Sequence, residues 1–357
     1  SRGLNLMQLS QILAGVASGY GARTVQFICT MALVPFFLQP EVLGIKGYGL
    51  AFTILAISGL LRFAVDGIRQ SFSRDISIAS RSTEAPHLIY LGSRIKVLSL
   101  LCFLLSACLI LSARWIVEIA GIPLAETNAL RLAAVLFWVE NSFFAFNVIL
   151  VNRGKAAFVN LCVASEVLFR SVVYVVIFSV YDASLDLYFG IQVVFAVLRS
   201  SALAIRVLWR QPGWLSALGR APLRIDRNSI AYSFPLSAYG ILDELGTRFP
   251  VLLTNAFLGP ESSGLVALVL NTTRRYVVQI LYSVLQPFAI PIGSRLDPRT
   301  VSDSFRASIW RIEAAYALLT TLLIGSAIAL ARELIMLWLG DEYIKTVLPI
   351  QVLLFAA

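Results

Sequence analysis

Long runs of apolar residues alternate with short polar segments along most of this chain. A membrane-spanning helix needs about 20 consecutive apolar residues, and the runs reach that length. They are too long and too uninterrupted to be barrel strands, which alternate apolar and polar positions. The pattern therefore predicts an all-α polytopic membrane protein with spans at 17–38, 48–68, 95–113, 129–151, 156–180, 186–208, 229–258, 262–290, 307–330 and from 347 onward.

The segments 18–127 and 237–346 repeat each other at an offset of 219 to 220 residues. Three short matches occur in the same order in both: Ser18, Tyr20 and Gly21 with Ser237, Tyr239 and Gly240; Phe37, Pro40 and Glu41 with Phe257, Pro260 and Glu261; Gly121 and Thr127 with Gly340 and Thr346. Internal repeats of this kind are typical of secondary transporters, whose binding sites lie where the repeats meet.

Six spans per repeat bring the chain back to the same side of the membrane, so the two halves are expected to insert in parallel. The sequence thus predicts an N-terminal six-helix lobe over 1–208, a cytoplasmic linker over 209–228 and a C-terminal lobe over 229–357. That second lobe is expected to be truncated, because about 70 further residues with two more helices would complete the repeat. The sequence then carries about 10 of an expected 12 or more transmembrane helices.

Composition excludes a water-soluble domain and also suggests the orientation. Hydrophobic residues make up 58% of the chain, charged residues 14%, and the mean hydropathy is +0.81. Sixteen Lys and Arg residues fall in the loops of one side, against five on the other: Lys46, Arg114, Arg131, Arg332 and Lys345. The positive-inside rule places the N-terminus in the cytoplasm. The net charge of +9 is spread over several loops, so no nucleic-acid partner is expected.

Cysteine and histidine residues predict no metal site. The cysteines at 29, 102, 108 and 162 all fall in expected spans without paired spacing, which favours packing roles. His87 is the single histidine and lies in an expected cytoplasmic loop. No catalytic group and no resident cofactor are predicted, while coupling to protons or sodium ions stays open.

Charged residues inside the expected spans are the main functional signal. Seven arginines fall there: Arg23, Arg62, Arg170, Arg199, Arg248, Arg274 and Arg275. An arginine at the centre of a membrane helix costs about 2.5 to 3.5 kcal/mol on insertion scales. These side chains are therefore expected to face a polar interior or to reach the membrane surface.

Several of these arginines belong to polar stripes with helical spacing. The stripes are Asn271, Arg275, Gln279, Tyr282 and Gln286; Gly19, Arg23, Gln26 and Thr30; Arg62, Asp66 and Arg69; and Asp243, Glu244, Thr247 and Arg248. The spans that carry them correspond to one another across the repeat. Each stripe predicts one polar face on a mostly apolar helix.

Internal ion pairs are one interpretation of these charges, with Arg62 paired to Asp66, Arg170 to Glu166, and Arg248 to Glu244. They do not account for the whole set, because seven arginines face five acids: Asp66, Glu140, Glu166, Asp243 and Glu244. A surplus of guanidinium groups suits an anionic ligand, since an Arg fork can bind phosphate oxygens with two parallel hydrogen bonds.

The sequence also resembles polysaccharide and lipid-linked oligosaccharide flippases of the multidrug/oligosaccharidyl-lipid/polysaccharide exporter superfamily. The resemblance is carried by Leu43-Gly44 and Gly47-Tyr48-Gly49, Val65 to Ile68 with Arg74, Phe257 to Gly259 with Gly264, and Leu339 to Tyr343. It departs from the family's pattern in the second repeat, where Leu265 and Val266 follow Gly264 without a tyrosine. The resemblance implies a MATE-like fold, with two lobes facing each other across a central cavity and alternating between inward-open and outward-open states.

These observations favour a flippase, not an enzyme, that moves an undecaprenyl-diphosphate-linked oligosaccharide across the bacterial inner membrane. The expected substrate-binding residues are Arg23, Arg62, Arg248, Arg274, Arg275 and Gln279, and the expected coupling or charge-balancing residues are Asp66, Asp243 and Glu244. Expected partners are the lipid-linked anionic glycan, membrane lipids and other polysaccharide-assembly proteins.

Two other functions remain as alternatives. A cation-coupled multidrug exporter of the same superfamily would need acids and aromatic groups facing its substrate, and the arginine surplus disfavours it. A membrane-embedded polysaccharide polymerase or ligase usually carries a sizeable extracytoplasmic loop, whereas the expected outside loops of this chain are short.

Overall fold

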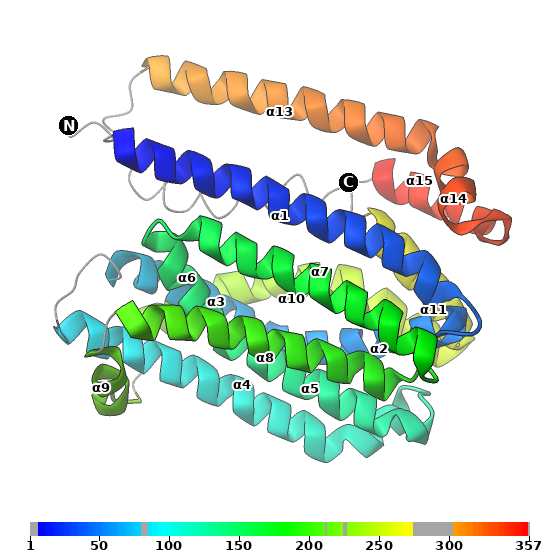
Figure 1. Cartoon of the computed structure of the whole chain (residues 1–357), viewed down its shortest axis with the longest axis horizontal. Coiled ribbons are helices and arrows are strands. Elements are labelled where there is room, and N and C mark those ends of the chain that lie inside the picture. The colour runs from blue at the N-terminus through cyan, green and yellow to red at the C-terminus, as the bar shows by residue number, and fades with distance from the viewer. Residues whose placement is uncertain (1–5, 80–84, 211–212, 224–226, 274–302, 356–357) are drawn as a thin grey trace. The chain divides into compact units, whose positions relative to one another are not determined.

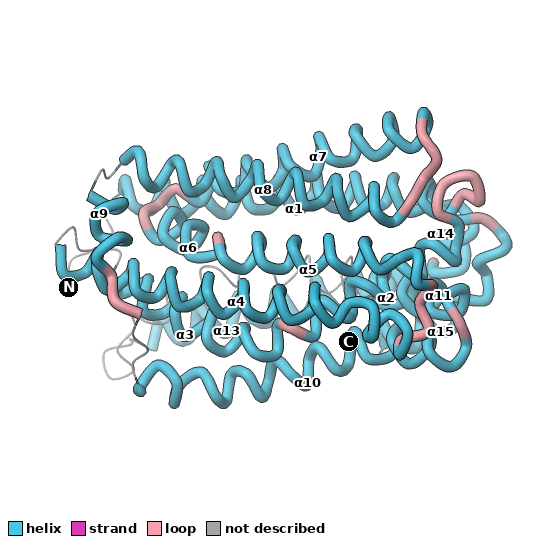
Figure 2. Tube along the Cα trace, turned by 90° about the horizontal axis from the view of Figure 1, so that it is seen from below, coloured by secondary structure: helices cyan, strands magenta, loops and turns pink. Residues whose placement is uncertain are grey.

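The computed structural model describes residues 6–79, 85–210, 213–223, 227–273 and 303–355. About 91% of these residues are helical and none of them lies in a strand, as the tube in Figure 2 shows. Contacts divide the chain into two units, Ser1–Gly264 and Leu265–Ala357. That division does not test the predicted lobe boundaries, so the two lobes remain a prediction.

The first unit holds ten α-helices within the residues described. They are α1 (Leu6–Leu38), α2 (Gly44–Leu60), α3 (Arg62–Ala79), α4 (Ala85–Ile119), α5 (Thr127–Ser142), α6 (Phe144–Asn152), α7 (Ala156–Val180), α8 (Leu185–Arg210), α9 (Gly213–Arg220) and α10 (Arg227–Leu258), with the short 3-10 helix η1 (Leu124–Glu126) before α5. The long helices α1, α4, α7 and α8 run along a common direction (Figure 1). Parallel alignment lets each helix bury one side against its neighbours.

The second unit begins within α11 (Pro260–Leu270) and continues in α13 (Asp303–Ala329), α14 (Ala331–Leu339), the 3-10 helix η3 (Asp341–Thr346) and α15 (Val347–Phe355). Its helices join at tight turns. Gly340 follows α14 with φ of +96°, a backbone conformation that side-chain-bearing residues rarely adopt. The amide of Gln351 donates to the carbonyl of Ile328 (2.9 Å), which ties α15 to α13.

Five stretches of the described chain are long and apolar enough to cross a membrane: Ala17–Leu38, Ile89–Ile119, Leu124–Asn152, Ala156–Val180 and Leu185–Trp209. The count rises to seven if two bent helix pairs each form one span. These helices support a membrane-embedded protein, and they overlap the spans predicted in the first 208 residues. The other expected spans are less well supported. Helix α10 is less apolar than the five, and most of 262–290 lies outside the described residues.

The predicted span 48–68 is a bent pair, with α2 and α3 meeting at an angle of 56°. The bend falls at Leu61, where the apolar sequence of α2 gives way to the charged sequence of α3. Arg248 of α10 donates from Nη1 to the carbonyl of Leu55 (2.9 Å), one turn and a half before the bend. A donor from a neighbouring helix helps to satisfy backbone polar groups beside such a break.

Helix α10 packs along both arms of the bent pair. Two glycines on α2 and α3 make this approach possible, because a Cβ at either would overlap atoms of α10: Gly59 with Arg248, and Gly67 with Ser237. Gly49 of α2 lies equally close to Pro260 at the start of α11. Small residues let membrane helices pack closely. The first helix after the predicted linker therefore packs tightly against the second predicted span.

Apolar side chains fill the first unit in two main groups. One includes Val65 and Phe72 of α3 and Leu98 of α4. The other includes Ile54 of α2 and Leu130 of α5. Many other apolar side chains on the long helices are exposed, as expected for helices that face lipid.

Candidate functional site

Five charged side chains from four helices form a continuous chain of ion pairs inside the first unit. Arg62 of α3 lies 3.5 Å from Glu140 of α5. Arg199 of α8 lies 3.8 Å from the other carboxylate oxygen of Glu140 and donates to Glu166 of α7 at 2.5 Å. Arg170, one turn further along α7, donates to Glu166 at 2.9 Å. The two glutamates thus each bridge two arginines.

The chain of ion pairs is most buried at Glu166 and most accessible at the Arg62 end. The side chain of Glu166 is 4% exposed, those of Arg199 and Arg170 are 22% and 24% exposed, and those of Arg62 and Glu140 are 33% and 31% exposed. Three guanidinium groups face two carboxylates, which leaves one positive charge in excess. The excess charge can act on a ligand most easily at the Arg62 end, where the side chains are least covered.

A second, neutral pair lies on the same helix as Arg62. Arg69 is 3.6 Å from Asp66 and donates to Oδ1 of Asn141 at 3.0 Å. Its guanidinium also lies over the ring of Phe144, 4.3 Å from the centroid. The Oδ1 atom of Asp66 is buried and accepts no hydrogen bond from the part of the chain that the structure describes. Asp66 is therefore held by charge attraction more than by directional bonds.

One of the ion pairs predicted from the sequence differs from those in the structure. The pair Glu166–Arg170 is confirmed, at the expected spacing of four residues. The predicted pair Arg62–Asp66 is wrong: Arg62 binds Glu140 of another helix, while Asp66 binds Arg69. Glu140 is contributed by α5, so the partner of Arg62 depends on how α3 and α5 pack and not on spacing within α3.

Sequence reasoning assigned no substrate role to Glu140, Glu166, Arg170 or Arg199. The signal was present, since all four are charged residues within apolar runs, and such residues are rare and functional by default. Glu166 and Arg170 share α7, but nothing in the sequence indicated that Glu140 of α5 and Arg199 of α8 meet them.

Only some of the residues predicted to form the site can be placed, and they do not form one cluster. Arg23 of α1 donates to Gln26 (2.8 Å), whose carbonyl accepts from Thr30 (2.7 Å), so neighbours of that stripe do contact one another. Arg248 binds backbone at the α2–α3 bend. Arg274, Arg275 and Gln279 lie outside the described residues, and Asp243 and Glu244 lie on α10 with side chains outside the description.

The helices and the charges between them define a membrane-embedded helical protein with a charged interior. Among the described residues, no group of three or more His, Cys, Asp or Glu side chains is arranged to hold a metal ion. Comparison with protein-family models, with curated proteins and with solved structures finds no match to this chain. Function therefore has to be argued from the site itself.

Proposed function

We propose that this protein is a flippase that moves an undecaprenyl-diphosphate-linked oligosaccharide across the bacterial inner membrane. The observation that carries the proposal is the chain of ion pairs from Arg62 to Arg170, which brings three arginines and two glutamates together among apolar helices. A surplus arginine in a poorly solvated interior attracts an anion, and a diphosphate is the anionic part of this lipid.

Arg62 is the residue of this set best suited to meet the substrate. Among the described residues its acidic partner is Glu140, at a distance of 3.5 Å, and a third of its side chain is exposed. A guanidinium has five N–H donors, so Arg62 can bind phosphate oxygens while Glu140 keeps its contact with Arg199. Arg23 and Arg248, together with Arg274 and Arg275, remain further candidates for the same anion.

Asp66 is proposed to balance charge or to couple transport to protons or sodium ions. It faces Arg69 and carries a buried oxygen that accepts no hydrogen bond from the described residues. The same role is proposed for Asp243 and Glu244.

The test is transport by the full-length protein in proteoliposomes, with a fluorescent undecaprenyl-diphosphate oligosaccharide as the probe and chemical quenching of the outer leaflet as the readout. Arg62→Ala is expected to lower the rate about 10-fold or more, because a charge-assisted hydrogen bond contributes roughly 1.5 to 3 kcal/mol. Arg62→Lys should give a transport rate between those of the wild type and Arg62→Ala, since lysine keeps the charge but loses the planar fork.

Arg131→Ala is the matched control. Arg131 is an exposed arginine at the start of α5, bonded to Asn128, and its loss removes the same charge outside the site. Wild-type rates in Arg62→Ala would exclude Arg62 from the site. If the wild type fails to move the lipid but takes up a cationic dye, the flippase is excluded and the multidrug exporter is favoured.

A further inference from the structure

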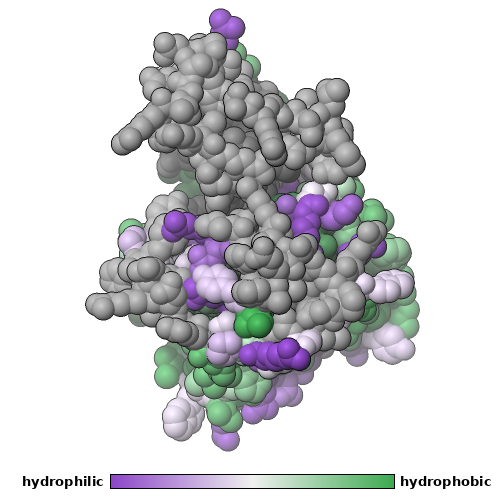
Figure 3. All heavy atoms as spheres, turned by 90° about the vertical axis from the view of Figure 1, so that its left-hand side faces the viewer, coloured by the Kyte–Doolittle hydropathy of each residue, from purple (hydrophilic) through white to green (hydrophobic). Residues whose placement is uncertain are grey.

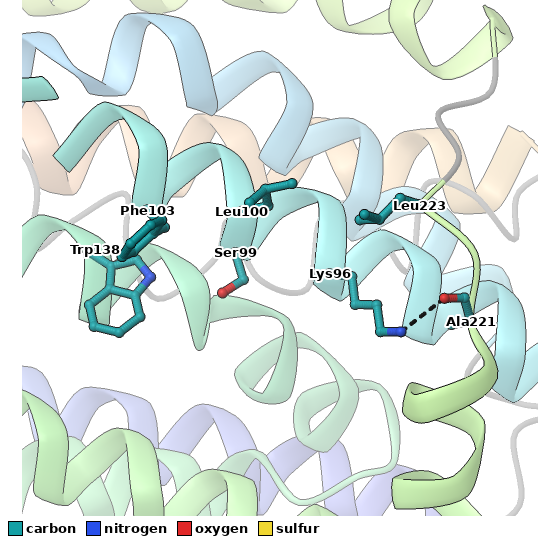
Figure 4. A pocket seen from close by; sticks show the side chains of 7 residues that line it. All are labelled: Lys96, Ser99, Leu100, Phe103, Trp138, Ala221 and Leu223. Carbon is teal, nitrogen blue, oxygen red and sulfur yellow. Dashed lines mark hydrogen bonds between the residues drawn. The ribbon is translucent and has the colours of Figure 1, made fainter. Parts of the chain in front are cut away.

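An open groove of about 570 Å³ runs along α4 in the first unit. Helix α4 contributes four of its lining residues, α5 contributes Trp138, and the segment after α9 contributes Ala221 and Leu223. Figure 4 shows Phe103 and Trp138 at one end, Lys96 with Ala221 and Leu223 at the other, and Ser99 and Leu100 between them. Lys96 thus gives one end of the groove a polar group, and the opposite end is aromatic.

Lys96 holds the polar end together. Its ammonium group donates to the carbonyls of Gly219 (3.2 Å) and Ala221 (2.9 Å), where α9 ends. An ammonium group has three N–H donors, so one remains beyond these two bonds. This tie attaches the predicted linker to α4 and places a positive charge at the mouth of the groove.

One further donor lies along the groove. The hydroxyl of Ser99 sits one turn from Lys96 on the same face of α4 (Figure 4). The Nε1 atom of Trp138 is buried, so Trp138 offers the groove apolar surface and no accessible donor.

The rest of the groove is apolar and uncovered. Leu100, Phe103 and Leu223 are 43%, 50% and 63% exposed. Phe103 packs edge-on against Trp138, with 5.7 Å between ring centroids. From Lys96 to Phe103 the helix rises by about 10 Å, which is the depth from a lipid headgroup to the upper part of its acyl chain.

We propose that this groove binds one anionic phospholipid. The phosphate is held by Lys96 and Ser99, and an acyl chain lies against Leu100, Phe103 and Trp138. Both donors then have an acceptor, and the exposed apolar side chains are covered. The same lipid would fasten the segment after α9 to α4, because Lys96 and Leu223 both contact it.

Charge favours an anionic lipid over a zwitterionic one. Arg220 ends α9 beside the groove, and Arg224 and Arg227 follow in the sequence. Figure 3 shows hydrophilic and hydrophobic side chains mixed among the described atoms on the face that it presents. The predicted orientation puts this end at the cytoplasmic leaflet, where anionic lipids give a negative surface potential.

The experiment measures phosphatidylglycerol binding to the full-length protein by native mass spectrometry after delipidation, with phosphatidylcholine and inorganic phosphate as the other probes. Lys96→Gln is expected to weaken phosphatidylglycerol binding at least about fivefold, which is the effect of one basic residue near an anionic surface. Ser99→Ala removes only the hydroxyl group, and should weaken binding roughly two- to tenfold.

Lys155→Gln is the control, because Lys155 is exposed between α6 and α7 and does not line the groove. Ser99→Ala leaves the bonds from Lys96 to Gly219 and Ala221 intact, so it tests the site even if Lys96→Gln displaces α9. Unchanged phosphatidylglycerol binding in both groove variants overturns the proposal. So does phosphatidylcholine binding as tight as that of phosphatidylglycerol, or full displacement of the lipid by inorganic phosphate.

Discussion

Replacing Glu166 with glutamine removes one negative charge from the most buried point of the chain of ion pairs and hardly changes the size of the side chain. The carboxylate of Glu166 accepts from Arg170 at 2.9 Å and from Arg199 at 2.5 Å, and its side chain is 4% exposed. A glutamine oxygen can accept from one of the two guanidinium groups, and the amide nitrogen then faces the other. One arginine is left without an acceptor in a poorly solvated place.

The expected loss in the free energy of unfolding follows from these contacts. Breaking a buried ion pair by removing one partner costs about 3 to 5 kcal/mol in soluble proteins. Polar contacts between membrane helices are worth less, on average about 0.6 kcal/mol and at most about 1.7 kcal/mol per pair. With two contacts altered at a site this buried, we expect Glu166→Gln to lower the free energy of unfolding by about 2 to 4 kcal/mol. That loss corresponds to a fall in Tm of roughly 5 to 15 °C.

The assay is thermal unfolding of the full-length protein in detergent, followed by tryptophan fluorescence. Glu118→Gln is the control, because Glu118 is an exposed acid near the end of α4. Adding Arg199→Gln to Glu166→Gln should recover part of the loss, with a coupling of about 1 to 3 kcal/mol, since it removes one of the stranded charges. A Tm for Glu166→Gln within about 2 °C of wild type, with no coupling to Arg199, would refute the reasoning.

Two further predictions concern packing and a buried cation. Gly67→Ala should lower the free energy of unfolding by about 1 to 3 kcal/mol, because the added methyl group overlaps Ser237 and pushes α3 away from α10. Gly190→Ala meets no atom within 4 Å and should be neutral or slightly stabilising, so equal melting temperatures for these two variants would contradict the close approach. Arg94 is 1% exposed and lies 3.2 Å from Asp75. Arg94→Ala should lower the free energy of unfolding by about 3 to 5 kcal/mol. A yield and a Tm in detergent equal to those of the wild type would count against a structural role for the pair.

Much of the secondary structure could be predicted from the sequence, for a physical reason that acts locally. Apolar runs of membrane length must satisfy their backbone hydrogen bonds internally, which requires helices. The predicted spans 17–38 and 156–180 accordingly agree with helices of nearly the same bounds. The pair Glu166–Arg170 was predictable in the same way, because a spacing of four residues puts both side chains on one face of a helix.

The bend between α2 and α3 was not predictable from hydropathy. The sequence from 48 to 68 is apolar enough for a single span, and the break at Leu61 depends on what packs beside it. Gly59 leaves space for Arg248, and Arg248 reaches the carbonyl of Leu55. Both contacts join residues nearly two hundred positions apart, so no local pattern contains them.

Hydropathy and composition are enough to show that this chain is helical and membrane-embedded, with several arginines inside its apolar segments. Which charges meet depends on how the helices pack. Arg62 lies four residues from Asp66, yet its partner is Glu140 of α5, and Arg199 joins Glu140 to Glu166 of α7. Spacing along one helix sets which side chains share a face, whereas the rotation and axial shift of each helix against its neighbours set which faces come together.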